Sequence, residues 1–397
     1  MASPRSQRNA LVLTGGGARA AYQVGVLRAI STITKYEKNP FHIVSGYSAG
    51  AINGTWLASR STNFDKVTQE MWQEWSGITM DRVFSTDVPS VVTIAAKWLW
   101  DRVKGGMNNN RQITYLLDTT PLNDFIQSRI DFNTLNAHLR SGDLHAVSIT
   151  AANYTTGHST TFFSGHESII GWEKLNRISV RTPLTAEHVM ASAAIPMFFQ
   201  PIQLGDSYYG DGMIRLNAPL SAAVRLGAER MMVIGIRGPS SVSHGNTKNN
   251  ETITVGEIAG TILNGLFFDS LDADIARMER VNRTLALMSE AELQRQGQER
   301  LRHIPLLTLK PTQEVNEFPA CELSRLPATL RFLLKGIGLK KNRGADLLTY
   351  LSFEPKYIRS LLELGYEDTL SKKDQVLAFF EGEKPDLVQE LNPNLHH

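Results

Sequence analysis

Residues 41–50 read FHIVSGYSAG, a short apolar run that ends in the pentapeptide Gly46-Tyr47-Ser48-Ala49-Gly50. One glycine stands two residues before the serine and another stands two residues after it. This pattern is typical of a strand that turns sharply into a helix, because small neighbours permit strained backbone angles and leave the serine Oγ exposed. The stretch therefore predicts a buried strand, a tight turn at Ser48 and a helix directly behind the turn.

The residues after Ser48 have the spacing of a packed helix, with apolar positions at Ala49, Ala51, Ile52, Trp56, Leu57 and Ala58. The N-terminus of that helix would point its free N–H groups and the positive end of its dipole at the serine, a field that favours an oxyanion. The pentapeptide alone is weak evidence, because a chain of this length contains about 0.1 such patterns by chance. Whether the pentapeptide marks a catalytic serine therefore depends on other motifs in the chain.

A glycine loop follows the first predicted strand, residues 9–14. The loop reads Gly15-Gly16-Gly17-Ala18-Arg19, and a helical face begins directly after it. Consecutive N–H groups beside a helix N-terminus form a cradle for an anion, either a phosphate or an oxyanion that develops on a carbonyl. The Walker pattern is absent, and Ala20 occupies the last glycine position of the dinucleotide pattern GxGxxG. The strand that ends at Ser48 comes about thirty residues later, as in a βαβ unit, so loop and serine should share one sheet edge.

A third segment places a carboxylate at the end of a predicted strand. Tyr208-Tyr209-Gly210-Asp211-Gly212-Met213 ends in an aspartate between two glycines, which leaves the side chain exposed at a turn. Taken alone, the segment is better explained as an ordinary Asp-Gly turn.

Composition excludes several classes of protein. The chain has 397 residues, 42% of them apolar, and 41 basic against 39 acidic residues, so it can bury a sizeable core and overall charge implies no nucleic-acid partner. Its single cysteine, Cys321, excludes an intramolecular disulfide and a cysteine-rich metal site. We see no signal peptide and no apolar run near 18 residues, which predicts a cytoplasmic protein without a membrane span.

The remaining pattern alternates strands and helices. It predicts a hairpin from residues 145–151 and 159–163, helices at 64–75 and 185–194 and from residue 120, and strands at 231–236 and 304–309. The chain is helix-rich from residue 253 onward, with a long helical period over residues 262–285. Two segments have open interpretations. Residues 78–111 combine an apolar helix with a glycine and asparagine tract, which suits a mobile lid or a surface excursion. Leu326 to Lys341 suits either contact with an anionic bilayer or a packed helix with a solvated basic face.

The three motifs, in this order and context, resemble the patatin-like phospholipase family. The likeness extends to residues 191–196, 217–220, 268–282 and 344–350, so it covers nearly the whole chain. Two positions depart from the family pattern. Ala20 stands where many members have glycine, which should stiffen the loop. Met213 stands where the family prefers a small residue, which should narrow the acyl pocket beside Asp211.

The resemblance implies an α/β fold, a three-layer sandwich with a mainly parallel central sheet, plus a helical C-terminal extension. It implies a serine acyl hydrolase that cleaves carboxylic esters of lipids, with phospholipids as the leading candidate substrates. The resemblance implies no metal or organic cofactor and no catalytic histidine. Ser48 would be the nucleophile and Asp211 the general base. The implied oxyanion-hole segment is Gly15, Gly16, Gly17, Ala18 and Arg19, with N–H donors from Gly16, Gly17 and Ala18, and the Asp-Gly motif continues through Gly212 and Met213. Arg19 would hold the loop or meet a lipid phosphate, the alternative being an ordinary surface cation.

We expect a catalytic domain over residues 1–250 and a helix-rich extension over 251–397 packed on it. The expected partners are a lipid or other acyl ester substrate and, peripherally, a membrane surface. Three alternatives use the same features: a transacylase with the same dyad, a phosphate- or nucleotide-binding module that needs only the glycine loop, and a non-catalytic lipid-surface protein.

Overall fold

The computed structural model describes residues 7–85, 117–196, 198–238, 255–289, 292, 301–315 and 349–382. The predicted lid beyond residue 85, the basic segment from Leu326 to Lys341 and Cys321 lie outside the described residues.

The described strands form one mixed sheet of ten strands. The main path runs β10-β9-β1-β2-β3-β4-β6-β5, and every neighbouring pair from β10 to β3 is parallel. The strands are β1 (Asn9–Leu13), β2 (Ile43–Tyr47), β3 (Ala146–Asn153), β4 (Ser159–Gly165), β5 (Glu173–Lys174), β6 (Arg177–Arg181), β7 (Ile202–Leu204), β8 (Ser207–Asp211), β9 (Arg230–Ile234) and β10 (Leu306–Leu309). The predicted hairpin is β3 and β4, which pair antiparallel. This mainly parallel sheet confirms the predicted fold class.

The central strands are buried on both faces, which explains their continuous apolar sequences. In β1, Leu11 and Leu13 contribute to one hydrophobic core, whereas Ala10 and Val12 contribute to the other. This alternation follows from the two-residue period of a strand. Residues on β9 alternate in the same way between the two cores.

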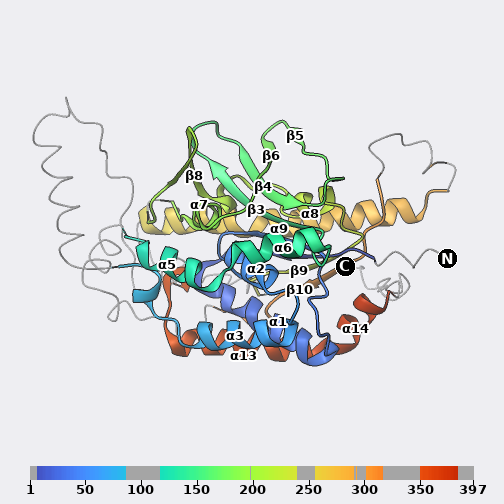
Figure 1. Ribbon diagram of the computed structural model, residues 1–397, viewed down its shortest axis with the longest axis horizontal. Coiled ribbons are helices and arrows are strands. Elements are labelled where there is room, and N and C mark those ends of the chain that lie inside the picture. Colours follow the sequence, from blue (N-terminus) through green and yellow to red (C-terminus); the bar gives the residue numbers. More distant parts are fainter. Residues whose placement is uncertain are drawn as a thin grey trace, which may run out of the picture.

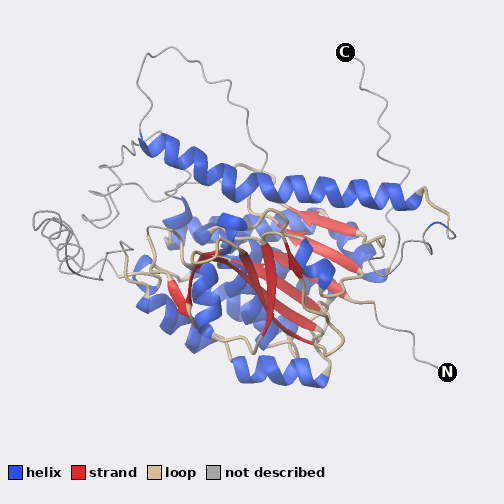
Figure 2. Ribbon diagram, turned by 90° about the horizontal axis from the view of Figure 1, so that it is seen from above, coloured by secondary structure: helices blue, strands red, loops and turns tan. Residues whose placement is uncertain are grey.

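Helices cover both faces of the sheet and complete three layers. Figure 1 shows α1, α3 and α13 on one side of the sheet and α9 on the other, and Figure 2 shows the twisted sheet between helices from a second direction. The helices are α1 (Ala21–Thr34), α2 (Ala49–Ser59), α3 (Phe64–Ser76), α5 (Thr120–Arg129), α6 (Phe132–Ser141), α7 (Ala186–Ala193), α8 (Ser221–Arg225), α9 (Val255–Ala286), α13 (Pro355–Ser371) and α14 (Lys373–Glu381), with 3-10 turns η1 (Gly17–Ala20), η2 (Met80–Arg82) and η3 (Gly212–Arg215).

Segments after residue 250 take part in both the sheet and the helical layers. β10 extends the sheet beside β9, and α13 packs closely on α1. A Cβ on Gly25 of α1 would lie 2.1 Å from the Leu362 carbonyl oxygen, and a Cβ on Gly365 of α13 would lie 2.2 Å from the Tyr22 carbonyl oxygen. Glycine is therefore required on both helices, since it lets the two backbones touch. The domain boundary near residue 250 stays a prediction.

Within the described ranges, we find no helix that is both long enough and apolar enough to cross a bilayer.

Candidate active site

Ser48 lies at the turn between β2 and α2, where the sequence pattern places it. Its backbone has φ 55° and ψ −134°, an unusual conformation for a residue with a side chain. A Cβ on Gly46 would lie 2.4 Å from the Gly50 carbonyl oxygen, and one on Gly50 would lie 2.3 Å from the Leu13 carbonyl oxygen. Both glycines are thus needed for close backbone approach around the turn. The helix α2 that starts at Ala49 is buried along its whole length and directs its N-terminus at Ser48.

The sheet topology brings Asp211 to Ser48 across 163 residues of sequence. Strand β2 ends with Tyr47 beside Thr150 of β3, and β8 pairs with β3 from Ala151 onward. Because β4 already occupies the other edge of β3 at Ala151, β8 must continue along the edge that β2 leaves. It runs antiparallel to β3, so the end of β8 meets the end of β2. This head-to-head arrangement places Asp211 against Ser48.

The two side chains form a short hydrogen bond. Ser48 Oγ donates to Asp211 Oδ2 at 2.5 Å. The other carboxylate oxygen, Oδ1, accepts the Met213 N–H at 3.0 Å, and the Asp211 N–H donates to the Ala194 carbonyl at 2.9 Å. Only 3% of Ser48 and 1% of Asp211 is exposed to solvent. The carboxylate is therefore held in one orientation, with one oxygen reserved for the serine.

Burial changes the chemistry of this carboxylate. Removal from water raises the pKa of Asp211 to about 7, although the hydrogen bonds from Ser48 and the Met213 N–H act in the opposite direction. An ordinary aspartate, with a pKa near 4, is a weak acceptor for a serine proton. A carboxyl group that titrates near neutral pH is better matched to general-base catalysis.

The glycine loop lies directly against the serine. A Cβ on Gly15 would lie 2.6 Å from Ser48 Cβ and 2.2 Å from Met213 Sδ. Gly17 has φ +55°, and a Cβ there would lie 2.3 Å from the Tyr350 carbonyl oxygen. In the described part of the chain, the N–H groups of Gly16 and Gly17 donate to no acceptor. These donors beside Ser48 suit an oxyanion that forms next to it.

Arg19 is a buried residue and not the surface cation that the sequence left as an alternative. Only 2% of Arg19 is exposed, and its Nε donates to Thr349 Oγ1 at 2.8 Å. Its guanidinium carbon lies 4.8 Å from the centre of the Tyr350 ring, within cation–π distance. Arg19 therefore connects the glycine loop to Thr349 and Tyr350, shortly before α13. These contacts support a structural role for Arg19 in holding the loop.

Sequence motifs did not identify Ser192 as a site residue, although the segment around it resembles the family. Ser192 lies on α7, its Oγ accepts the Ser48 N–H at 2.8 Å, and its hydroxyl donates to the Thr150 carbonyl at 2.6 Å. It thereby connects the serine turn to β3. The same strand pairs with β8, which carries Asp211. A serine in a helix has many ordinary uses, so only its spatial position gives it this role.

A buried polar network also supports the glycine loop and escaped the sequence analysis. Gln23 on α1 donates to the Thr14 carbonyl at 2.6 Å, directly before the loop. Asn53 on α2 donates to Gln23 Oε1 and to the Ala20 carbonyl, and accepts from Trp75 Nε1 at 3.0 Å. The Asn53 amide thus has partners for both its donors and its acceptor, and the Gln23 amide uses one donor and its acceptor. The network connects both ends of the loop to the helix that follows Ser48.

Two cavities open at Ser48. One is bounded by Gly17, Asp211, Met213 and Tyr350, so the bulky Met213 does line the space beside the carboxylate. The other is apolar, and its walls come from α2, α3, α5 and neighbouring segments: Ala49, Ile52, Trp75, Ile78, Val83, Leu122, Phe125, Ala193, Ile195, Phe199 and Phe353. No histidine of the described residues lines either cavity. An apolar wall on one side of the serine suits a hydrocarbon chain.

The fold and the site together define an α/β protein with a strained serine, a hydrogen-bonded carboxylate and a glycine loop at one sheet edge. The sequence profile described as "Patatin-like phospholipase" matches residues 11–224, which is more than half of the chain. The chain belongs to this family of lipid acyl hydrolases. No curated protein sequence is significantly similar to the chain.

The solved structures to which this chain is similar are distant from it. VipD from Legionella pneumophila has 11% identity and a TM-score of 0.33, over 94% of this chain and 68% of VipD. Human GIVD cytosolic phospholipase A2 in complex with methyl γ-linolenyl fluorophosphonate has 13% identity and a TM-score of 0.45, over 95% of this chain and 59% of the human protein. The type III effector protein ExoU has 13% identity and a TM-score of 0.37, over 94% of this chain and 54% of ExoU. The chain thus spans little more than half the length of the last two proteins.

Proposed function

We propose that this protein hydrolyses carboxylic esters of lipids through a Ser48–Asp211 dyad, with phospholipids as the leading candidate substrates. The observation that carries the proposal is the buried hydrogen bond of 2.5 Å between Ser48 Oγ and Asp211 Oδ2. A serine hydroxyl becomes an effective nucleophile when an adjacent base within hydrogen-bond distance accepts its proton. Membership of the patatin-like phospholipase family supports the same chemistry.

The reaction would proceed in two halves. Ser48 Oγ attacks the acyl carbonyl while Asp211 takes the hydroxyl proton, and the Gly16 and Gly17 N–H groups stabilise the negative charge on the carbonyl oxygen. The tetrahedral intermediate then expels the alcohol, which receives the proton from Asp211, and leaves an acyl-enzyme. Water attacks the acyl-enzyme in the second half, Asp211 accepts a proton from it, and return of that proton to Ser48 Oγ releases the fatty acid.

The apolar lining beside Ser48 supports a lipid acyl chain as the group that is transferred. Ile52, Trp75, Phe125, Phe199 and Phe353 line the cavity, which reaches Ser48. Burial of each methylene of a substrate chain among such side chains contributes about 0.8 kcal/mol. The cavity has a volume of about 30 Å³, so a lipid acyl chain must move the lining side chains apart to be accommodated.

The first test is hydrolysis of a short-chain p-nitrophenyl ester by the wild type, Ser48→Ala and Asp211→Asn, together with labelling by a fluorophosphonate probe. We expect both substitutions to lower kcat by about 10⁴-fold or more, as loss of a nucleophile or its base does in serine hydrolases. Ser48→Ala should also abolish labelling. Ser76→Ala, which removes an exposed hydroxyl at the end of α3, is the matched control.

The outcomes separate the alternatives. Turnover that survives both substitutions would exclude the dyad. Absence of turnover and labelling in the wild type would favour the non-catalytic lipid-surface protein. Adding glycerol or a lysolipid distinguishes a transacylase, because the acyl group then appears on the added alcohol and not as free fatty acid.

A further inference from the structure

A second cavity lies at the opposite edge of the sheet from Ser48. It has a volume of about 550 Å³, within the size range of small-molecule sites. Arg8 directly precedes β1, His145 directly precedes β3, and Gly227 shortly precedes β9. Because these strands are parallel, their amino ends meet at one edge, whereas Ser48 follows the carboxyl end of β2. The cavity is therefore separate from the candidate active site.

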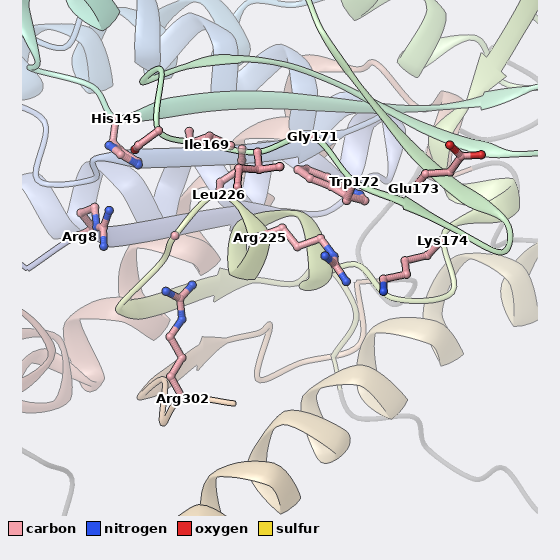
Figure 3. Close-up of a pocket in the computed structure, with 13 residues that line it drawn as sticks. Arg8, His145, Ile169, Gly171, Trp172, Glu173, Lys174, Arg225, Leu226 and Arg302 are labelled. Carbon is pink, nitrogen blue, oxygen red and sulfur yellow. The ribbon is translucent and has the colours of Figure 1, made fainter. Parts of the chain in front are cut away.

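Cations dominate the wall of this cavity. Arg8, Lys174, Arg225 and Arg302 line it, and Glu173 is the one carboxylate among the described lining residues. Figure 3 shows Arg225 and Lys174 toward one side of the cavity and Arg8 and Arg302 toward the other. These four cations come from four separate segments of the chain, so the cluster is created by the fold.

The charges of the cluster are only partly neutralised. Arg8 pairs with Glu229 at 2.8 Å. Within the described residues, neither Arg225 nor Arg302 lies within salt-bridge distance of a carboxylate, and Arg302 donates to the carbonyl of Val224. Partial burial, followed by the nearby guanidinium of Arg8, lowers the pKa of Arg302, whereas the Glu229 carboxylate acts in the opposite direction. Such an arrangement costs free energy through like-charge repulsion unless an anion occupies it.

The rest of the described wall carries no negative charge apart from Glu173, and Glu229 lies beside the cavity paired with Arg8. Burial and the nearby Arg8 lower the pKa of His145 to about 4, so this imidazole is neutral at physiological pH and can accept or donate a hydrogen bond. Ile169, Trp172 and Leu226 give the cavity an apolar side between the two cationic groups. A ligand with more than one anionic group matches the two cationic groups of this wall.

We propose that this cavity binds a small anion that carries two or more phosphate groups, either as a free molecule or as the head group of a lipid. One phosphate would meet Arg8 and Arg302, and another would meet Arg225 and Lys174. Arginine is suited to this role because its planar donors match phosphate oxygens in pairs. Arg225 and Arg302 are exposed side chains, so a ligand can reach them from solvent.

The test is isothermal titration calorimetry of the full chain with inorganic pyrophosphate at low salt, and sedimentation with phosphatidylcholine vesicles that contain or lack cardiolipin. Arg225→Ala is the principal variant, because the described residues give Arg225 no structural partner. We expect it and Arg302→Ala each to weaken binding about tenfold or more. Arg140→Ala removes an exposed arginine of α6 outside the cavity and should leave binding within about twofold.

Thermal unfolding of each variant tests whether the fold is retained. Pyrophosphate binding that Arg225→Ala weakens and Arg140→Ala does not would support a site for a free phosphate ligand. Cavity-dependent binding to cardiolipin vesicles alone would support the lipid head group. The proposal is overturned if neither probe binds saturably, or if wild type and Arg225→Ala bind the probes equally.

Discussion

The carboxyl and amino edges of the central sheet differ in how far their charged groups are exposed to solvent. At the carboxyl edge, Asp211 is 1% exposed, a single charge surrounded by protein and hydrogen-bonded to Ser48. At the amino edge, four cations surround an open cavity of about 550 Å³. Burial strengthens the interaction of one charge with a fixed partner, because no water competes for it. An open basic cavity instead attracts a diffusing anion and releases it again.

The comparison explains why the carboxyl edge has so little tolerance for change. Its backbone and side chains are in contact around Gly15, Ser48 and Met213, and the reacting atoms depend on that packing. The amino edge has empty space and exposed side chains, so a substitution there changes binding without changing the packing of the core. Substitutions at each edge can test this contrast.

Among substitutions that keep the reacting side chains, the largest effect should come from Gly15→Ala at the carboxyl edge. The new Cβ would lie 2.2 Å from Met213 Sδ and 2.6 Å from Ser48 Cβ, so both side chains must move. A displacement of about 1 Å in a reacting group costs on the order of 10²-fold in rate, and we expect at least that loss in kcat. Steady-state ester hydrolysis measures it.

Gly171→Ala makes the same substitution at the amino edge. The nearest atom to the new Cβ is Ser179 Oγ at 3.3 Å, much farther away than the atoms that a Cβ on Gly15 would meet. We expect hydrolysis within about twofold of wild type and a loss of stability below about 1 kcal/mol. Equal losses of activity in the two alanine variants would break the contrast between the edges.

The pH dependence of hydrolysis should report the buried carboxylate. Asp211 must be deprotonated to accept the Ser48 proton, and burial raises its pKa to about 7. As pH falls below 7, the deprotonated fraction drops, so kcat/KM should decrease about tenfold for each pH unit and level off above 7. The profile of kcat/KM against pH with a p-nitrophenyl ester is the measurement. A profile that stays flat down to pH 5 would show that Asp211 keeps an ordinary carboxyl pKa.

A smaller effect is expected from Ser192→Ala. This change removes the acceptor for the Ser48 N–H and the donor to the Thr150 carbonyl, and leaves both buried backbone groups unsatisfied. We expect a loss of about 1–3 kcal/mol in stability and about tenfold in kcat, with KM little changed, because Ser192 positions the serine turn without contacting the reacting carbonyl. Denaturant unfolding measures the loss of stability, and steady-state kinetics measure kcat and KM. Ser192→Thr keeps the hydroxyl, and failure of this variant to retain more activity than Ser192→Ala would contradict the positioning role.

Local chemistry in the sequence was enough to predict each motif where it stands. The glycines around Ser48, the loop Gly15 to Arg19 and the strand that ends at Asp211 all depend on short-range sterics and on apolar periodicity, which neighbouring residues specify. For the same reason the hairpin of β3 and β4 and the helical periodicity of α9 could be predicted, whereas the mainly parallel sheet was implied by the family resemblance. The βαβ spacing predicted that the glycine loop and Ser48 share one sheet edge, whereas the pairing of Asp211 with Ser48 rested on family resemblance.

Only the tertiary structure decided which distant groups meet. The sharing of one edge of β3 by β2 and β8 brings Asp211 to Ser48, and the packing of α7 brings Ser192 to the same turn. Burial of Arg19 against Thr349 and Tyr350 likewise depends on a segment 330 residues away. The basic cavity joins Arg8, Lys174, Arg225 and Arg302, which no local pattern links. Such contacts follow from strand pairing and from packing in the core, which depend on the whole chain at once.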